Sequence, residues 1–333
     1  MSSVPETARL TARPAQRSAM EPVPLLPRTR MIGSMLGAHT SIRRGQGSDV
    51  AGSRLYRPGD HARSIDWKAS ARLSAVTGGD DFIVRERYAH EMPRVVILCD
   101  RRPAMALYPS DLPWLSKPLA VERIAELIVV SAVNQRGLVG YLDHASHGAE
   151  NVAGAPFWRP PRAHGGSWGE ENLVEQVEAH LRGGLDAPAD TLDQGLQFLS
   201  VVAAAVPIGS FVFVVSDFLE PPPRESWAAA IDRGWDLVAV VVQDPVWEQS
   251  FPPIGGVVTP FVAADGGALE YVRLTEGEAT ARRELNRARL AQLENDLLEL
   301  GVDPIFVSSE DRGAVQSAFL EWSEHRLTVR GLL

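Results

Sequence analysis

From Arg94 onward, short and continuously apolar segments alternate with amphipathic ones, and this alternation limits the possible folds more than any other feature. The two most apolar segments, Val95–Asp100 and Phe211–Asp217, each end in an acid. Because they are apolar throughout, and not only at every second residue, both of their faces should be buried. Strands that alternate with helices predict an α/β class, with a mostly parallel sheet and helices on both faces.

The same reading gives an expected element order. The expected strands are 95–100, 138–142, 211–217, 236–243 and 305–308, and the expected helices are 119–135, 171–181, 191–206, 225–233, 276–300 and 312–326. Two Gly-Gly turns predict a hairpin over 257–274, and 144–170 is expected to be irregular. We therefore predict three regions: a disordered leader over 1–29, a small β- and turn-rich segment over 30–92, and an α/β domain over 93–333.

A charged and turn-rich stretch, Gly45–Arg72, dominates the second region. From Arg54 onward it combines four arginines and two acids with a Pro-Gly turn and two large aromatic residues, which are expected to be anchors in a core: Arg54, Tyr56, Arg57, Pro58, Gly59, Asp60, Arg63, Asp66, Trp67 and Arg72. Arginine pairs bidentately with carboxylates, so Asp60 and Asp66 are expected to organise the arginines around them. The stretch is either a self-satisfied salt-bridged turn or a recognition surface, and the residue types alone leave both open.

The pattern R-x-Y-x-P-G-D-x-x-R-x-I-D-W-x-x-S-A-R over Arg54–Arg72 closely resembles the signature of the DUF58 family. Proteins of that family are similar in fold to von Willebrand factor A domains and are usually encoded beside MoxR-type AAA+ ATPases. The resemblance implies a von Willebrand factor A-like architecture and a MoxR-type AAA+ ATPase as partner. The family's biochemical activity is poorly defined.

A von Willebrand A fold usually holds Mg²⁺ at the carboxyl edge of its sheet, in a metal-ion-dependent adhesion site (MIDAS). The resemblance places that site on five positions, namely Asp100, Arg102, Ala104, Thr191 and Asp217. Arg102 and Ala104 stand where the family pattern has serines, which removes two oxygen ligands and adds a fixed positive charge. We therefore predict a degenerate MIDAS without a functional metal. Either Arg101 or Arg102 offsets the two aspartates, or both arginines point to water and the acids cap adjacent helices.

Composition limits the location and the partners. Residues 1–90 hold 14 Lys+Arg against 8 Asp+Glu, a net charge of +6. Because the whole chain has a net charge of -9, the remaining residues have a net charge of -15. Acids are interleaved with the bases, which argues against a nucleic-acid protein. The single cysteine, Cys99, is expected to be a buried apolar residue, and its isolation fits a reducing compartment. No long apolar span or signal core is found, so we expect a cytoplasmic protein without a membrane span. His144, His147 and His164 are expected to be exposed to solvent.

These observations leave three functional hypotheses. The first is a non-enzymatic protein-interaction module that acts as adaptor or assembly factor for a MoxR-type AAA+ ATPase, with Arg54–Arg72 and the loops around Asp100, Thr191 and Asp217 as its surface. The second is a metal-dependent hydrolase, which would require Asp60, Asp66, Asp100 and Asp217 to converge. The third, with the least support, is nucleic-acid binding through the N-terminal arginines. No complete catalytic constellation is found in the sequence, which favours the first.

Overall fold

A six-stranded sheet forms the centre of the protein, as seen in a computed structural model that describes residues 20–28, 50–57, 65–79, 81–87, 93–106, 115–145, 156–161, 184–256, 258–261 and 270–329. The strands lie in the order β10-β7-β6-β3-β4-β5. Their bounds are β3 (Arg94–Cys99), β4 (Leu138–Asp143), β5 (Phe157–Arg159), β6 (Phe211–Ser216), β7 (Asp236–Val242) and β10 (Asp303–Val307). All neighbouring pairs are parallel except β4 and β5.

This strand order fixes where a ligand site can lie. Counted along the chain from β3, the strands stand in the order 3-2-1-4-5-6, which is that of doubly wound α/β folds. The direction of winding reverses between β3 and β6, which pair in parallel from Val95 opposite Phe211 to Cys99 opposite Val215. In such sheets ligands bind beyond the carboxyl ends of the strands at this switch point.

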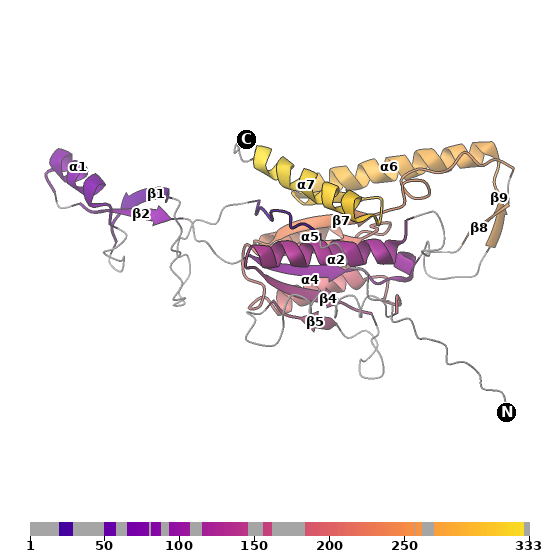
Figure 1. Cartoon of the computed structure of the whole chain (residues 1–333), viewed down its shortest axis with the longest axis horizontal. Helices are drawn as coiled ribbons and strands as arrows, with labels where there is room; N and C mark the ends of the chain where they lie inside the picture. Colours follow the sequence, from indigo (N-terminus) through magenta and orange to yellow (C-terminus); the bar gives the residue numbers. More distant parts are fainter. Residues whose placement is uncertain are drawn as a thin grey trace, which may run out of the picture.

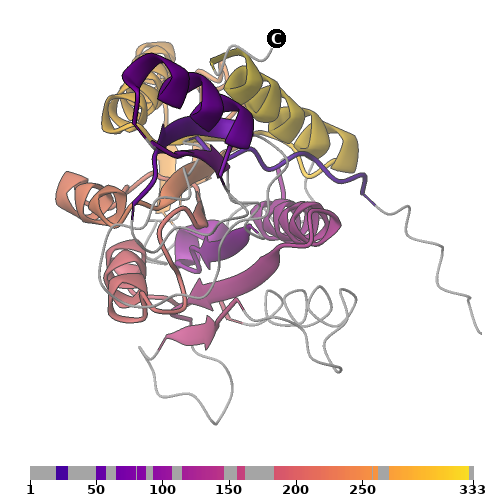
Figure 2. The ribbon, with the colours of Figure 1, turned by 90° about the vertical axis from the view of Figure 1, so that its left-hand side faces the viewer.

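Helices cover both faces of the sheet (Figures 1 and 2). Helices α2 (Lys117–Asn134) and α7 (Arg312–Val329) pack on the face that includes Ile97 and Phe213. Helices α4 (Thr191–Val201), α5 (Arg224–Asp232) and α6 (Glu276–Leu300) pack on the opposite face. The predicted α/β class, with a mostly parallel sheet between two helical layers, is confirmed.

The local sequence explains several of these boundaries. Helix α6 begins at a capping box, in which Thr275 and Glu278 bond each other's backbone N–H, and it ends at Gly301 with φ 76°. Helix α4 lies close to β3 because residue 195 is glycine. A Cβ atom there would lie 2.5 Å from Leu98 Cδ1. The expected helix over 171–181 lies outside the described residues, and β5 is a strand inside a region predicted to be irregular.

Residues 20–28 form an ordered arm across α2 and α7. Met20, Val23 and Leu25 are buried in the core. The Val23 N–H donates to Ser131 Oγ at 2.9 Å, and Arg326 Nη1 donates to the Leu26 carbonyl at 2.6 Å. The prediction of a disordered leader over 1–29 is therefore wrong for residues 20–28, because their apolar side chains bury against two helices. Residues 1–19 lie outside the described part of the chain.

A second, small unit carries the DUF58-like signature. Strands β1 (Val50–Leu55) and β2 (Ile83–Arg87) form an antiparallel pair, and α1 (Trp67–Thr77) lies between them in sequence. Figure 1 draws this unit apart from the central sheet. Strands β8 (Val258–Phe261) and β9 (Glu270–Arg273) form the predicted hairpin, which lies near the far end of α6 in the same figure. None of the described helices has the length and apolar character needed to cross a bilayer.

Candidate functional site

Two buried carboxylates flank the switch point. Asp100 directly follows β3 and Asp217 directly follows β6, and each is only 1% exposed. Phe218, the next residue, adopts φ 48°, a left-handed conformation that is uncommon for a bulky side chain. It is held there by an N–H bond to Ser216 Oγ at 3.0 Å and by packing of its ring on Trp227. This backbone conformation belongs to the turn that carries the residues after Asp217 across the sheet edge.

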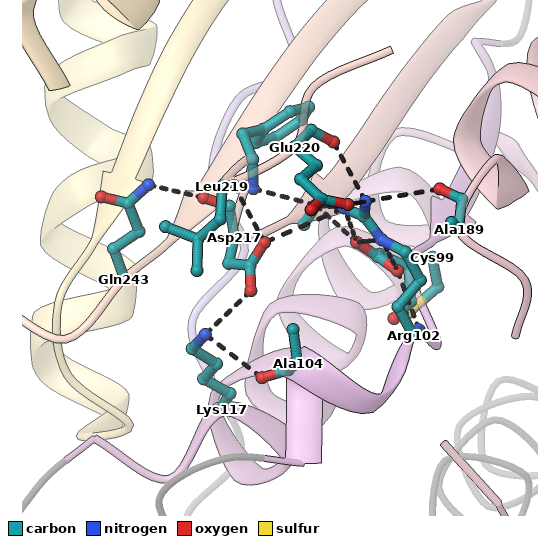
Figure 3. Close-up of polar contacts among 12 residues, drawn as sticks. Cys99, Arg102, Ala104, Lys117, Ala189, Asp217, Leu219, Glu220 and Gln243 are labelled. Atoms are coloured by element: carbon teal, nitrogen blue, oxygen red, sulfur yellow. Dashed lines mark hydrogen bonds and ion pairs between the residues drawn. The ribbon is translucent and has the colours of Figure 1, made fainter. Parts of the chain in front are cut away.

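The Arg102 guanidinium binds the Asp100 carboxylate. It also donates to the carbonyls of Ala189 and Glu220 (Figure 3). Arg102 Nη2 donates to Asp100 Oδ2 at 2.7 Å, Arg102 Nε donates to Oδ1 at 3.1 Å, and the Arg102 backbone N–H donates to the same Oδ1 at 2.9 Å. The Ser216 hydroxyl donates to Oδ2 at 2.6 Å. Burial alone would lower the pKa of Arg102. The hydrogen bonds to Asp100 and the negative charges of Asp100, Asp217 and Glu220 together outweigh burial and raise that pKa above its ordinary value. Both oxygens of Asp100 therefore already hold donors.

Lys117 binds the second carboxylate, that of Asp217, as Arg102 binds Asp100. Its side chain is fully buried in the first turn of α2, where Nζ lies 2.9 Å from Asp217 Oδ2 and 2.6 Å from Glu248 Oε1. Burial would lower the pKa of Lys117, but the two carboxylates outweigh burial and raise it. Burial raises the pKa of Glu248, although Lys117 opposes that effect. Asp217 Oδ1 accepts from the Leu219 N–H at 3.1 Å, so this carboxylate too has donors on both oxygens.

The loop that carries Glu248 is braced from a distant element. Arg289 Nη2 on α6 donates to the Glu248 carbonyl at 2.7 Å, and Asn286 Nδ2 donates to the Trp247 carbonyl at 3.1 Å. Glu248 Oε2 in turn accepts from the Asp244 N–H at 2.9 Å. The position of Glu248 opposite Lys117 thus depends on α6.

The five predicted MIDAS positions behave differently from one another. Asp100, Arg102 and Asp217 come together, with Arg102 Nη2 lying 3.9 Å from Asp217 Oδ1. Ala104 contributes only its carbonyl, which accepts from Lys117 Nζ at 3.3 Å. Thr191 is buried in the first turn of α4, and its hydroxyl finds no hydrogen-bond partner in the described part of the chain. In the described ranges, no three His, Cys, Asp or Glu side chains are grouped so that they could hold a metal ion.

The alternative in which both arginines point to water is wrong. Arg102 is 6% exposed and Arg101 is fully buried. Arg101 points elsewhere, with Nη2 donating to the Gly184 carbonyl and Nη1 lying 3.9 Å from Asp143 Oδ2. Arg102 binds Asp100 because it stands two residues after that acid, and a guanidinium at this spacing reaches the carboxylate directly.

Two further predictions concern Cys99 and His144. Cys99 is buried as expected, and burial raises the pKa of its thiol to about 12. His144 was expected to be exposed to solvent, but it is only 3% exposed. Burial lowers the pKa of His144, against the opposing charges of Asp143 and Asp190. The error arose because His144 directly follows β4 and is carried into the sheet edge by that strand.

A pocket of about 190 Å³ lies beside the residues that follow β3 and β6. Five of its lining residues supply apolar walls, namely Pro103, Ala104, Ala187, Ala189 and Leu219. The other three supply charge, namely Arg102, Asp217 and Glu220. We call this the switch-point pocket. Small-molecule sites typically enclose roughly 300–1,000 Å³, so this pocket has the size of a single side chain or a small fragment.

The small unit shows how the signature residues are used. Asp66 is the N-cap of α1, where Oδ1 accepts from the Ala69 N–H at 3.1 Å. The Ser70 hydroxyl donates to the Asp66 carbonyl and accepts from the Ile83 N–H, both at 2.8 Å, which ties α1 to β2. Asp66 and Ser70 are therefore structural residues of this unit. Pro58, Gly59, Asp60 and Arg63 lie outside the described residues.

The two aromatic residues of the signature are not core anchors. Tyr56 and Trp67 each form a T-shaped pair with Phe82, and their ring centroids lie 6.3 and 5.8 Å from that of Phe82. Their exposed fractions are 40% and 62%, and Phe82 is 39% exposed. Arg57 and Arg72 are also exposed, and Arg54 is partly buried. The unit is too small to enclose these rings, so they form an aromatic surface, which we call the aromatic cluster (Tyr56, Trp67 and Phe82).

Fold and site together define a doubly wound α/β domain with a charged pocket at its switch point, joined in sequence to a small unit with an exposed aromatic cluster. The family described as "Protein of unknown function DUF58" matches residues 52–295, and the chain belongs to this family. The uncharacterized protein Rv1480 of Mycobacterium tuberculosis (strain ATCC 25618 / H37Rv) is 24% identical over 250 residues, which cover 74% of this chain and 70% of that protein. The uncharacterized protein Mb1516 of Mycobacterium bovis gives the same values.

Solved structures show weaker similarity. The conserved hypothetical protein BatB from Bacteroides thetaiotaomicron superposes with a TM-score of 0.39 at 17% identity, covering 70% of this chain and 98% of that one. An aerotolerance-related membrane protein from Bacteroides fragilis NCTC 9343 gives 0.39 at 14% identity, covering 70% and 99%. At this level of similarity neither description transfers to the present chain.

Proposed function

We propose that this protein is a non-enzymatic interaction module, an adaptor or assembly factor that works with a MoxR-type AAA+ ATPase in the cytoplasm. The class of partner comes from the resemblance of Arg54–Arg72 to the DUF58 signature. The cytoplasmic placement is supported by the single, buried cysteine, which suits a reducing compartment. The binding surface in this proposal is the aromatic cluster, together with the loops at the switch point.

The observation that carries the proposal is the exposure of Trp67. Asp66, which precedes Trp67, caps helix α1, and Ser70, three residues after Trp67, ties that helix to β2. The Trp67 indole itself is 62% exposed. Large aromatic residues and arginines are the side chains that dominate binding energy at protein interfaces. A tryptophan displayed beside Tyr56 and Phe82, with the Arg57 and Arg72 side chains exposed in the same signature, is the composition of such a hot spot.

The switch point supports a binding role over the hydrolase alternative. A catalytic Mg²⁺ needs several free oxygen ligands in near-octahedral geometry. Here the oxygens of Asp100 and Asp217 already accept from Arg102, Ser216, Lys117 and Leu219. Asp66 is committed to the cap of α1 and does not join them.

The test is the affinity of the full chain for a purified MoxR-type AAA+ ATPase from the same organism. Trp67→Ala should weaken binding about 30-fold or more, because truncating a hot-spot residue costs about 2 kcal/mol or more. Tyr271→Ala is the matched control, since Tyr271 is an exposed aromatic residue, 70% exposed, on β9. Equal affinity of wild type and Trp67→Ala, or absence of binding by the wild type, would refute the proposal. Thermal melts of each variant verify that it is folded.

A further inference from the structure

We propose that the switch-point pocket receives a lysine or arginine side chain from a protein partner. This inference rests on the proposed function and names the chemistry by which the partner would be recognised at this site. Arg102 lines the pocket, and an arginine by itself would indicate a site for an acidic ligand. The neighbouring groups indicate a basic ligand instead.

The described groups of the site carry an excess of negative charge. The buried and rim carboxylates outnumber the cations by four to two, with Asp100, Asp217, Glu220 and Glu248 against Arg102 and Lys117. The excess is -2, and it is still -1 when Glu248 is protonated. Asp186 and Asp190, on either side of the lining residues Ala187 and Ala189, are exposed acids and add to it. An incoming carboxylate would therefore be repelled, and a cation would be attracted.

Glu220 is a carboxylate that a partner can reach. Its carboxylate is 69% exposed and lies 3.6 Å from Arg102 Nη1. That same nitrogen already donates to the Glu220 carbonyl at 3.1 Å, and the rest of the guanidinium is engaged by Asp100. Glu220, which lies beside Arg102 in Figure 3, is thus the more exposed of the two carboxylates that line the pocket, and it can pair with a second cation.

The volume and the lining of the pocket suit a long basic side chain. Lysine and arginine combine an apolar stem with a charged head, and they bury the stem along apolar surface while the head finds a polar partner. The walls of Ala104, Ala189 and Leu219 suit the stem, and Glu220 and Asp217 lie where the head would end. A cavity of about 150 Å³ holds a benzene-sized molecule, so about 190 Å³ is adequate for one such side chain. A bare Mg²⁺ would find apolar walls where it needs oxygen ligands.

The experiment uses butylguanidinium as a probe that reproduces the end of an arginine side chain. It is titrated into the ¹⁵N-labelled full chain, and the amide signals of Leu219 and Glu220 are followed. We expect saturable shifts with a Kd of about 1 mM, as is typical of so few non-hydrogen atoms. Glu220→Gln should weaken the affinity about tenfold, because the charge-assisted bond is lost. Ala189→Leu, which adds volume at an exposed position of the lining, should abolish binding.

The matched control is Glu225→Gln, which removes the same charge from an exposed glutamate of α5 that does not line the pocket. It should bind like the wild type. The proposal is overturned if butyrate shifts the same signals as strongly, if MgCl₂ does so, or if Glu220→Gln binds butylguanidinium unchanged. A wild type that fails to bind butylguanidinium, yet binds the ATPase through Trp67, would refute this inference and leave the proposed function intact.

Discussion

Lys117 is the residue that holds the second half of the site together, and nothing in the sequence distinguishes it. It looks like an ordinary charge at the start of a helix, followed by Pro118 as helix starts often are. Only the folded chain brings it to Asp217, which is 100 residues away, and to Glu248, which is 131 residues away. Arg102, by contrast, could be predicted, because it stands two residues from the acid it binds.

Lys117→Met should destabilise the protein strongly. The variant leaves Asp217 and Glu248 buried without their shared cation, and breaking such a buried pair from one side costs about 3–5 kcal/mol. Urea denaturation measures this loss. Lys68→Met is the matched control, since Lys68 is exposed on α1 and its loss should change the stability by less than about 0.5 kcal/mol. Equal stability of the two variants would mean that Lys117 is not the cation of this site.

The pH dependence of that stability has a defined sign. The folded-state pKa of Lys117 is raised, so its contribution is fully present below the ordinary lysine value of 10.5 and is lost as pH rises through the folded pKa. The stability difference between wild type and Lys117→Met should therefore persist from neutral pH to about 10.5 and shrink only above it. A difference that disappears already below pH 9 would contradict the raised pKa.

At the scale of elements, the sequence predicts the central sheet far better than the small unit. Strands β3, β6 and β7 each contain at least five consecutive apolar residues, and α6 has a capping box, so their positions follow from local signals. Strand β5 has three residues and β1 contains Gly52, so neither has a strong local pattern. Their pairing depends on partners distant in sequence, which a local pattern does not reveal.

Helix α1 is capped at its amino end by the Asp66 side chain, which gives a prediction for the small unit. Asp66→Ala removes the acceptor for the Ala69 N–H and should cost about 1 kcal/mol. Amide hydrogen exchange should then speed up in α1 and β2, and exchange in β3 and β6 should not change. Asp66→Asn retains a capping oxygen and should restore most of the protection. Unchanged exchange in Asp66→Ala would show that α1 does not rely on this cap.

At the scale of the whole molecule, the arm formed by residues 20–28 shows what sequence composition conceals. The arm lies within a stretch rich in Ser, Pro and Ala, which indicated disorder, yet three of its apolar residues bury against α2 and α7. Arg326 on α7 holds it by donating to the Leu26 carbonyl, and also pairs with Asp236 and Asp303. An irregular segment with few apolar residues becomes ordered when the folded domain offers a groove between helices, which no local pattern encodes.

Only part of the candidate site could be predicted from the sequence, because some of its residues meet only in the folded chain. The topology places the ends of β3 and β6 side by side, so Asp100 and Asp217 could be assigned from their positions after apolar strands. Thr191 was assigned from the resemblance, and its hydroxyl lacks a hydrogen-bond partner in the described residues. Ser216, Glu248 and Glu220 were missed, because their role depends on how three loops meet at the sheet edge.

We propose that Arg102 and Lys117 hold the charge at the switch point that a metal would hold in a complete MIDAS, and that the domain binds a partner there instead of hydrolysing a substrate. Calorimetric titration of the full chain with MgCl₂ up to about 10 mM, which covers weak divalent sites, tests it most directly. We predict heats equal to those of dilution, for the wild type and for Asp217→Ala alike. Saturable Mg²⁺ binding by the wild type that is abolished in Asp217→Ala would contradict the claim and favour the metal-dependent hydrolase.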